Sequence, residues 1–324
     1  MRKNNTLREI GDKLLESSSL LIFPHIMMDG DAIGSAVALC LAMRDRGLES
    51  WVVIEDKLAD NLQFLMKGCC VPLQECSITA PDISLCIDCG DHSRYPERAE
   101  LYDSGRIKIC IDHHPTSEGI ADYNYIDPGA AATGEIVFDL LTECGVDINT
   151  EIAECLFAAI ATDTGNYMYS NTTRRSHEIT MALMDTGIDC SETGVKIYEN
   201  EPIEKMSLQS RVLSGLELFA DGQGVIAEVT QQMLQETGAR MEDTEGIVSR
   251  LRSLKGVEIA VLVKEVGPGE YKVTMRAKMR GDVAAIAVRH DGGGHVKAAG
   301  CTLRGTLEEA RAIIMQEVTA ALEV

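Results

Sequence analysis

Four short stretches of acids and histidines are the residues of this chain whose types and spacing could do chemistry. They are His25 with Asp29 and Asp31, then Asp88, then Asp112-His113-His114, and finally Asp163. Each stretch directly follows an apolar run. Short apolar runs that end in a polar loop are typical of buried parallel strands, and ligands bind at the carboxyl ends of such strands. We therefore expect all four stretches to meet at one edge of a parallel sheet.

Carboxylates brought that close together would repel one another unless a cation lies between them. The donors are imidazoles and carboxylates without a thiolate, which favours Mn²⁺, with Mg²⁺, Co²⁺ or Fe²⁺ as alternatives, over structural Zn²⁺. The CxxC spacing from Cys86 to Cys89 has no second pair and lies inside an expected strand, so it argues little for zinc. The residues predict a site with more than one divalent ion. Sites of that kind activate water and stabilise an in-line displacement at phosphorus.

Two of the stretches have an ordinary structural explanation beside the chemical one. Asp29 or Asp31 could cap the helix that is expected from Ala32, and Gly30 between them would let the backbone bend tightly. Asp163 could likewise be a helix cap. A lone Asp-Gly-Asp is more often a cap than a ligand pair, so this stretch alone decides nothing.

The other two stretches raise the weight of the chemical explanation. Asp88 could be a turn acid, and a lone His-His pair is commonly surface. Adjacent histidines at a strand end face opposite ways, so we expect only one of His113 and His114 to bind metal. The other would orient a ligand or contact substrate. Four such stretches in one strand-and-helix pattern are hard to explain as coincidence.

The elements that must position these residues alternate between strands and helices. We expect helices over 7–17, 32–46 and 176–184, helices or buried segments over 133–144 and 152–162, and strands ending near residues 23, 55, 88, 112 and 126. This alternation predicts an α/β domain with a doubly wound, mostly parallel sheet over residues 1–190. A long, polar, helical connector is expected over 191–218.

A second pattern follows the connector. We expect strands over 225–229, 258–265 and 271–276, the last two forming a hairpin over Gly267-Pro268-Gly269. Helices are expected over 244–254 and 306–322. The pattern predicts a smaller α+β domain over residues 219–324.

The second domain contains a glycine run that could bind a phosphate. Gly292, Gly293 and Gly294 precede His295, and consecutive glycines let backbone N–H groups approach a phosphate closely. His295 could add a hydrogen bond, and Arg276 at the end of the preceding strand could form a bidentate clamp. A flexible loop is the alternative explanation of the run.

Composition limits the class of ligand. The chain has 324 residues and a net charge of −21, which argues against a protein that wraps long nucleic acid. The stretch from Arg240 to Arg304, however, contains 12 Lys and Arg and 8 Asp and Glu. Its net charge is therefore +4, and the rest of the chain carries −25. An acidic first domain suits divalent cations, and a more basic second domain suits an anionic ligand. Most of these charges are also explained as solvated surface.

Cysteine usage and hydropathy bear on the compartment. The 11 cysteines are scattered, and several, such as Cys40, Cys86 and Cys110, lie in apolar runs, as reduced core cysteines do. No apolar run approaches the length that spans a membrane, and the first residues do not resemble a signal peptide. We expect a cytoplasmic protein without a membrane partner.

The motifs resemble those of the DHH phosphoesterase family, which is named for its Asp-His-His sequence. The resemblance rests on His25 to Ser35, Asp88-Cys89-Gly90-Asp91, Asp112-His113-His114, Thr162-Asp163-Thr164-Gly165 and, for the associated C-terminal DHHA1 domain, Gly292 to Gly300. These motifs are specific in combination and order, and they cover nearly the whole chain. The chain is most similar to the nanoRNase/pAp-phosphatase branch, the bifunctional oligoribonucleases.

The resemblance implies roles for individual residues. His25, Asp29 and Asp88 would hold one metal ion, most consistent with Mn²⁺. Asp31, Asp88, His113 and Asp163 would hold a second ion, with Asp88 bridging the two. Asp88, His113 and His114 would be the catalytic residues, and His114 would orient a ligand or contact substrate. Arg276, Gly292, Gly293, Gly294 and His295 would bind the substrate phosphate.

The resemblance also implies the reaction. Members of that branch degrade very short oligoribonucleotides from an end and remove the 3′-phosphate of 3′-phosphoadenosine 5′-phosphate (pAp). One departure bears on substrate choice: Asp291 stands where the family commonly has the first of four glycines, and a negative charge there would weaken phosphate binding or shift preference. A homodimer would be unsurprising.

Other functions remain open on the sequence alone. A linear or cyclic dinucleotide phosphodiesterase would use the same metals and clamp. A pyrophosphatase or polyphosphatase would be expected to be richer in Lys and Arg, and a single-strand DNA exonuclease would want an extra binding domain. A nucleotide-binding regulatory module, the alternative from a different class, would be expected to have lost a metal ligand, and none is lost here.

Overall fold

The computed structural model describes residues 4–91, 94–117, 119 and 121–323. The chain divides into two compact units, Met1–Asn200 and Glu201–Val324. Each unit has its own sheet.

The first unit is built on a six-stranded parallel sheet. Its strands, in the order in which they lie, are β3 (Cys70–Pro72), β2 (Glu49–Ile54), β1 (Ser19–Phe23), β4 (Ile83–Ile87), β5 (Ile107–Asp112) and β6 (Tyr123–Ile126). The strand order reverses between β1 and β4. In doubly wound sheets, ligands bind outside the carboxyl ends of the strands at this reversal.

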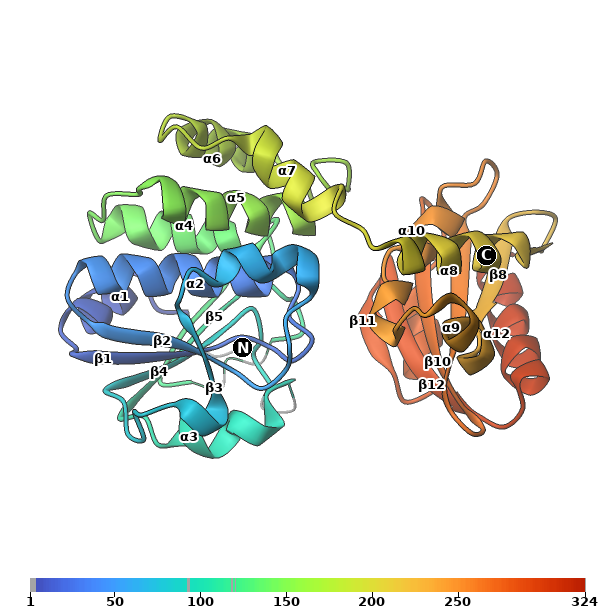
Figure 1. Ribbon diagram of the computed structural model, residues 1–324, viewed down its shortest axis with the longest axis horizontal. Coiled ribbons are helices and arrows are strands. Elements are labelled where there is room, and N and C mark those ends of the chain that lie inside the picture. Colours follow the sequence, from blue (N-terminus) through green and yellow to red (C-terminus); the bar gives the residue numbers. More distant parts are fainter. Residues whose placement is uncertain (1–3, 92–93, 118, 120, 324) are drawn as a thin grey trace. The chain divides into compact units, whose positions relative to one another are not determined.

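Helices cover both faces of this sheet (Figure 1). One face carries α1 (Leu7–Leu15), α2 (Gly30–Asp45), α4 (Thr133–Glu143) and α5 (Thr150–Asp163), and the other carries α3 (Ala99–Asp103). Outside α4 and α5 lie α6 (Arg174–Met184) and α7 (Cys190–Tyr198). Short 3₁₀ segments occur at η1 (Asp60–Met66), η2 (Leu73–Glu75) and η4 (Pro96–Arg98). The predicted doubly wound α/β fold is therefore confirmed.

Helices α2 and α5 approach each other closely because glycines line the contact. A Cβ atom on Gly30 would lie 2.4 Å from Thr162 Oγ1, and one on Gly34 would lie 2.5 Å from the carbonyl oxygen of Cys155. Gly30 is the first residue of α2 and does not have a positive φ. The expected reason for this glycine, a tight bend, is therefore wrong; its small size is what the packing requires.

The second unit is a mixed sheet covered by helices on both faces, as the α+β prediction required. Its strands lie in the order β11 (Gly293–His295), β12 (Ala298–Arg304), β10 (Glu270–Ala277), β9 (Ile259–Gly267), β8 (Gly224–Val229) and β7 (Glu217–Phe219). The β8–β9 pair is parallel, and the other pairs are antiparallel. The hairpin expected over Gly267-Pro268-Gly269 joins β9 to β10.

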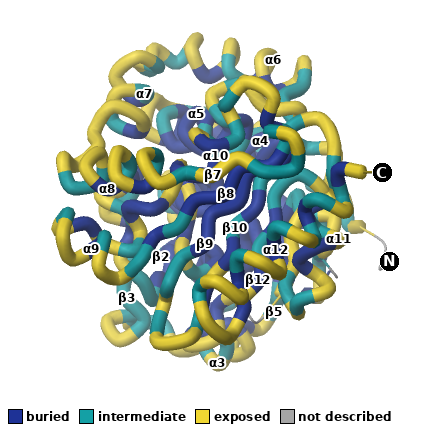
Figure 2. Tube along the Cα trace, turned by 90° about the vertical axis from the view of Figure 1, so that its right-hand side faces the viewer, coloured by how far each residue is buried: buried dark blue, intermediate teal, exposed yellow. Residues whose placement is uncertain are grey.

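The two faces of this second sheet bury different apolar clusters. One cluster joins β8 and β9 to α8 (Ile203–Ser214), α9 (Gln231–Thr237) and α10 (Ile247–Arg252). The other joins β9, β10 and β12 to α11 (Val283–Val288) and α12 (Leu307–Leu322). Figure 2 shows β8 and β9 in the dark blue of buried residues. None of the helices in the described part of the chain has both the length and the hydropathy to cross a membrane.

Three expectations about elements differ from the structure. Asp163 ends helix α5, which confirms the helix alternative for 152–162, and it does not follow a strand as the other three acidic stretches suggested; a short run of Ala and Ile is equally typical of a buried helix. The helix expected over 244–254 is shorter, with a 3₁₀ turn, η5 (Met241–Thr244), before α10. Residues 191–218 contain parts of two helices, α7 and α8, with Pro202 as the N-cap of the second. The expected division points at 190 and 218 stay predictions beside the observed division after Asn200.

The α2–α5 contact gives a prediction with a matched control. Gly34→Ala should lower the free energy of unfolding by about 1–3 kcal/mol, because the new methyl group meets a backbone carbonyl that cannot move easily. Gly194→Ala, in helix α7 with open space around the position, should raise it by roughly 0.5–1 kcal/mol. Urea unfolding of the two variants measures both; equal effects would contradict the account of the contact.

Candidate metal centre

The predicted metal ligands come from four places along the chain and converge at the carboxyl ends of β1, β4 and β5. His25 follows β1, and Asp29 and Asp31 stand at the N-terminus of α2. Asp88 directly follows β4, and His113 directly follows β5. Asp163 reaches the same region from the last turn of α5, through the close contact of α5 with Gly30.

Among the described residues, three groups of donor atoms lie close enough to hold an ion: His25, Asp29 and Asp88; Asp31, His113 and Asp163; and Asp88, His113 and His114. The first two contain the predicted metal ligands, and Asp88 lies next to both. In one group, His25 Nε2 lies 3.7 Å from Asp29 Oδ1 and 3.5 Å from Asp88 Oδ2. In the other, His113 Nε2 lies 3.8 Å from Asp31 Oδ2, 3.6 Å from Asp88 Oδ1 and 3.7 Å from Asp163 Oδ2. The two oxygens of Asp88 thus face different groups. This is the arrangement in which one carboxylate can bridge two cations.

The outer nitrogen of each imidazole in these groups already has a partner. His25 Nδ1 lies 2.7 Å from the carbonyl oxygen of Ile26, and His113 Nδ1 lies 3.2 Å from that of Ala130. A carbonyl can only accept, so Nδ1–H donates in both rings and, in the neutral ring, Nε2 keeps its lone pair. Nε2 is the atom that faces the carboxylates. Metal-binding histidines are commonly oriented in this way.

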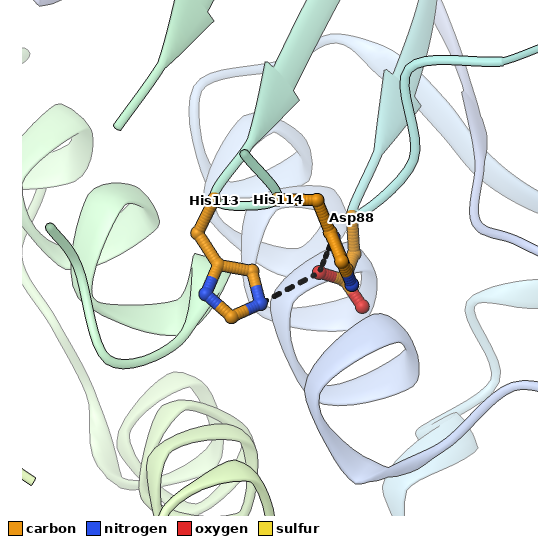
Figure 3. A group of neighbouring side chains, drawn as sticks. All are labelled: Asp88, His113 and His114. Atoms are coloured by element: carbon orange, nitrogen blue, oxygen red, sulfur yellow. Dashed lines mark ion pairs between the residues drawn. The ribbon is translucent and has the colours of Figure 1, made fainter. Parts of the chain in front are cut away.

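His114 differs from His113 in the nitrogen that it offers. Its Nδ1 lies 2.7 Å from Asp112 Oδ1, and the same atom is 3.7 Å from Asp88 Oδ1. Figure 3 shows both histidines directed towards Asp88. The centroids of the two rings are 4.6 Å apart. The expectation that adjacent histidines face opposite ways is therefore wrong, because β5 ends at Asp112 and both histidines lie beyond the strand. Asp112 accepts a hydrogen bond from Nδ1–H of His114, so this nitrogen has no lone pair for a metal ion. His113 is therefore the better metal ligand of the two.

Asp31 is held by the N-terminus of α4. It accepts hydrogen bonds from the backbone N–H groups of Thr133 (2.7 Å) and Gly134 (2.9 Å) and from Ser35 Oγ (2.9 Å). The Thr133 hydroxyl donates in turn to Asp88 Oδ1 at 2.8 Å. Helix N-termini stabilise carboxylates because their free N–H groups point outwards. Asp29 is indeed the N-cap of α2, accepting from Ala32 N–H, so capping and proximity to His25 occur together.

Sequence reasoning missed these supporting residues. Thr133 begins helix α4 after Ala130-Ala131-Ala132, and no local pattern indicated that it would face two acids. Asn171, whose side chain donates to Asp163 Oδ2 at 3.4 Å and to the carbonyl oxygens of Ala131 and Asp163, was also not singled out. The only sequence signal for a role of Asn171 is the Asn-Thr-Thr stretch that follows the fourth motif.

Asp88 has a strained backbone. Its φ is 56°, in the left-handed region that side chains other than Gly, Asn and Asp seldom adopt. The backbone N–H of Asp88 donates to the carbonyl of Ile111, so the residue is fixed to the neighbouring strand as β4 ends. Strained conformations of this kind persist at functional sites when the surroundings over-determine them. The conformation points the Asp88 carboxylate to both donor groups.

The charges in the centre are badly balanced without a cation. Burial, together with the negative charges of Asp88, Asp163 and Asp29, raises the pKa of Asp31. Burial also raises the pKa of Asp163 to about 7; the charges of His113 and His114 act to lower it, and those of Asp29 and Asp88 act to raise it. Burial opposes the charged form of His25, but hydrogen bonds to Asp29 and Asp88 raise its pKa to about 10. Protons thus take the place that cations would fill.

The other predicted site residues belong to the second unit. Arg276 on β10 and His295 on β11 are both registered with Ala298 on the intervening strand β12. Residues directly opposite in neighbouring strands point to the same face of a sheet, so Arg276 and His295 share one face roughly 10 Å apart. Lys297, in contrast, donates to the carbonyl oxygens of Met279 and Gly281 and supports that loop.

The glycine run forms strand β11 and the turn before it. A Cβ on Gly292 would lie 2.2 Å from the carbonyl oxygen of Gly300, and one on Gly294 would lie 2.5 Å from that of Ala298. A Cβ on Gly293 would meet nothing within 4 Å. Two of the three glycines are therefore required by the hairpin with β12, whereas Gly293 keeps an exposed backbone free of side chain. Asp291, the departure from the expected run, has a φ of 54°.

Comparisons with known protein families find one domain match in each of the two units. The DHH family, N-terminal domain, matches residues 19–160, and the DHHA1 domain matches residues 221–323. A bifunctional oligoribonuclease and PAP phosphatase NrnA from Thermus thermophilus is 31% identical over 309 residues, covering 94% of this chain and 90% of that protein. The protein of the same name from Bacillus subtilis is 24% identical, covering 88% of this chain and 89% of that protein.

A solved structure extends the comparison to the fold. The crystal structure of an exopolyphosphatase-related protein from Bacteroides fragilis superposes with a TM-score of 0.91 at 24% identity. The superposition covers 98% of this chain and 97% of that one. The fold is therefore shared over both units.

The electrostatics of the centre give a prediction for the metal-free protein. In EDTA, NMR titration should find His25 protonated up to a pH of about 10, whereas an unfolded histidine has a pKa near ~6.5. A raised folded pKa stabilises the protein fully below about pH 6.5, and that stabilisation is lost as the pH rises towards 10. Asp88→Asn should lower the pKa of His25. A His25 pKa unchanged by this substitution would contradict the geometry described above.

Proposed function

The chain belongs to the DHH family, and from this premise we propose that it hydrolyses short oligoribonucleotides to mononucleotides and removes the 3′-phosphate of pAp. The observation that carries the proposal is the pair of donor groups that share Asp88. Support for the substrates comes from the relatives whose printed names state oligoribonuclease and PAP phosphatase, which match both units. The protein is thereby proposed as a hydrolase of phosphoric esters.

The donor set fits two divalent metal ions. We assign His25, Asp29 and Asp88 to one ion. We assign Asp31, Asp88, His113 and Asp163 to the other. Imidazole and carboxylate donors without thiolate suit Mn²⁺, with Mg²⁺, Co²⁺ or Fe²⁺ as alternatives. Two ions held there would supply an activated water and offset the negative charge that develops at phosphorus.

The chain's own residues prepare the centre for this chemistry. The Nδ1–H bonds of His25 and His113 hold each ring so that Nε2 faces the carboxylates. Burial opposes the charged form of His114, but Asp112, Asp88 and Asp163 raise its pKa, so its ring carries a proton to higher pH. A protonated His114 beside Asp88 could donate a hydrogen bond to a phosphate oxygen of the substrate. In the second unit, Arg276, Gly292, Gly293, Gly294 and His295 are proposed to bind the terminal phosphate.

Charge and composition favour a short substrate. The balance of +4 between Arg240 and Arg304 is modest, and aromatic residues make up only 4% of the chain. Long single strands are usually bound by an extensive basic groove with stacking aromatics. Unpaired thiols in the core, such as those of Cys40, Cys86 and Cys110, support a reducing compartment such as the cytoplasm. A homodimer stays a prediction.

The function is tested by Mn²⁺-dependent hydrolysis of a substrate panel. The panel contains a labelled RNA dinucleotide, a longer RNA, linear and cyclic di-adenylate, pAp and pyrophosphate. We expect cleavage of the RNA dinucleotide and pAp. Asp88→Ala should lower both rates by about 10³-fold or more, because both donor groups lose a member, and this corresponds to roughly 4 kcal/mol of barrier.

The control for this experiment is Asp45→Ala. Asp45 is an exposed acid at the far end of α2 from Asp31, and its replacement should leave both rates within about twofold of the wild type. Activity confined to cyclic dinucleotides or pyrophosphate would overturn the substrate assignment. Metal binding without hydrolysis of any substrate would favour a nucleotide-binding regulatory module.

Metal binding should release protons. At pH 7, Asp163 with a pKa of about 7 and His25 with a pKa of about 10 carry protons that a cation must displace. Titration calorimetry of Mn²⁺ in buffers of different ionisation enthalpy should therefore detect release of about one proton or more, and the affinity should fall as the pH is lowered. His25→Asn should reduce the number of protons released. Proton-independent binding would contradict the assignment of these ligands.

A further inference from the structure

We propose that a pocket beside His114 binds the ribose of the nucleotide that carries the scissile phosphate, and that Asp112 and Ser117 in this pocket recognise the 2′-hydroxyl group. The inference rests on the proposed function for the reaction. It adds the means by which the first unit would distinguish ribose from deoxyribose, and it gives Asp112 a role beyond orienting His114.

The pocket is formed by the loops that follow β4 and β5. Its volume is about 190 Å³, which is room for several water molecules or for one five-membered sugar ring. Two of the residues that line it, Asp88 and His114, are also among the donors of the metal centre. A group bound in the pocket would therefore lie next to a phosphate bound at that centre.

Asp112 supplies the pocket with a buried hydrogen-bond acceptor. One of its oxygens, Oδ1, accepts from the backbone N–H of His114 at 3.1 Å and from the ring nitrogen Nδ1 at 2.7 Å. The other oxygen, Oδ2, is enclosed and has no hydrogen-bond partner among the described residues, and the residue is only 1% exposed. A buried carboxylate oxygen without a donor is unfavourable, so Oδ2 indicates that a donor from outside the chain binds there.

Ser117 places a hydroxyl group near this acceptor. Its Oγ is also enclosed without a hydrogen-bond partner in the described part of the chain. Burial raises the pKa of Asp112, but His114 and then Ser117 lower it below its ordinary value, so the hydroxyl lies near the carboxylate although no hydrogen bond of ordinary length joins them. The backbone N–H of Ser117 donates to the carbonyl oxygen of His114 at 3.1 Å, and this turn fixes the hydroxyl beside the metal centre.

The pocket exists in this form because position 90 is a glycine. A Cβ atom on Gly90 would lie 1.7 Å from Ser117 Oγ, so any larger residue there would displace the Ser117 side chain. Gly90 follows Asp88 by two residues in the loop after β4. The loops after the two strands therefore fit together so that the hydroxyl of one lies over the backbone of the other.

A sugar hydroxyl fits this pair of atoms better than a phosphate or a base amine does. A hydroxyl group both donates and accepts, so one hydroxyl can donate to Asp112 Oδ2 and accept from Ser117 Oγ. An ionised phosphate only accepts, and the carboxylates of Asp88 and Asp112 would repel it. An exocyclic amine of a base donates but does not accept. The 2′-hydroxyl is the group by which a protein distinguishes RNA from DNA.

The position of the pocket selects the ribose nearest the reaction. Asp112 Oδ1 and Asp88 Oδ1 both lie close to one atom, His114 Nδ1, at 2.7 and 3.7 Å. Figure 3 shows the His114 ring directed towards Asp88. In a ribonucleotide, the 2′-hydroxyl and the 3′-phosphate are on adjacent carbons. One nucleotide can therefore present its 3′-phosphate to the metal centre and its 2′-hydroxyl to Asp112.

The test compares ribose with deoxyribose in the full-length protein with Mn²⁺. The measured quantity is kcat/KM for pAp and for the 2′-deoxy analogue of pAp. The wild type should prefer pAp by about tenfold or more, because the analogue leaves Asp112 Oδ2 without a donor. Ser117→Ala should lower kcat/KM about three- to tenfold for pAp and less than about twofold for the analogue, because only pAp loses a hydrogen bond.

The matched control is Ser104→Ala. Ser104 donates to the carbonyl oxygen of Leu101 at 2.6 Å and precedes β5, so it lies at the opposite edge of the sheet from the pocket. Its replacement should leave the preference for pAp within about twofold of the wild type. Equal kcat/KM for the two substrates in the wild type would overturn the inference. An equal loss with both substrates in Ser117→Ala would do so as well, since a purely structural role of Ser117 gives that result.

A failure of the proposed function would be recognised separately. If the wild type hydrolyses neither substrate, the proposed function fails, and the pocket is tested alone by titration calorimetry of pAp and its 2′-deoxy analogue with the Mn²⁺-loaded protein. Weaker binding of the analogue to the wild type, with no such difference in Ser117→Ala, would support the pocket. Equal binding of the two compounds to the wild type, or binding of neither, would overturn it.

Discussion

Four carboxylates, those of Asp29, Asp31, Asp88 and Asp163, lie together at one edge of the sheet of the first unit. Their mutual repulsion is the constraint that the rest of this unit must satisfy. Charges this close are unfavourable in a partly buried site unless positive groups lie between them. The chain supplies two imidazoles, at His25 and His113, and the N–H groups that begin α4. These do not balance the centre, as the raised pKa values of Asp31 and Asp163 indicate. Divalent cations, as proposed above, would complete the balance of charge in this cluster.

Much of the surrounding architecture follows from bringing those carboxylates together. The strand order reverses between β1 and β4, which opens the sheet edge where His25 and Asp88 emerge. The fourth acid arrives from a helix, and that requires α5 to pack against α2 more closely than side chains normally allow. Gly30 and Gly34 make this approach possible. Thr133 links Asp31 to Asp88, so one helix terminus orients an acid from each donor group.

The sequence predicted the fold class, and the residues that it singled out as metal ligands lie together at one edge of the sheet, because strand ends in a parallel sheet converge. That these residues bind metal stays a prediction. The sequence left open whether residues 152–162 form a helix or a buried segment, since a short run of Ala and Ile has no period that separates helix from strand, and the structure shows that Asp163 ends a helix. Nor could the sequence give the orientation of His114, which depends on where β5 ends and on the bond to Asp112. Thr133 and Asn171 were missed because no local sequence pattern indicates their contacts. Thr133 contacts Asp31, more than a hundred residues away in the chain, and Asn171 contacts Asp163 around a turn. The glycine run was recognised, but packing against β12 explains Gly292 and Gly294 better than phosphate binding does.

The central claim is that these residues form a centre for two metal ions bridged by Asp88. The most direct test is a crystal structure of the protein grown with Mn²⁺, with anomalous diffraction collected at the manganese edge. The account predicts two anomalous peaks about 3.5–4 Å apart. One peak should contact His25 and Asp29, the other should contact Asp31, His113 and Asp163, and Asp88 should contact both. A single peak, or two peaks without a shared carboxylate, would contradict it.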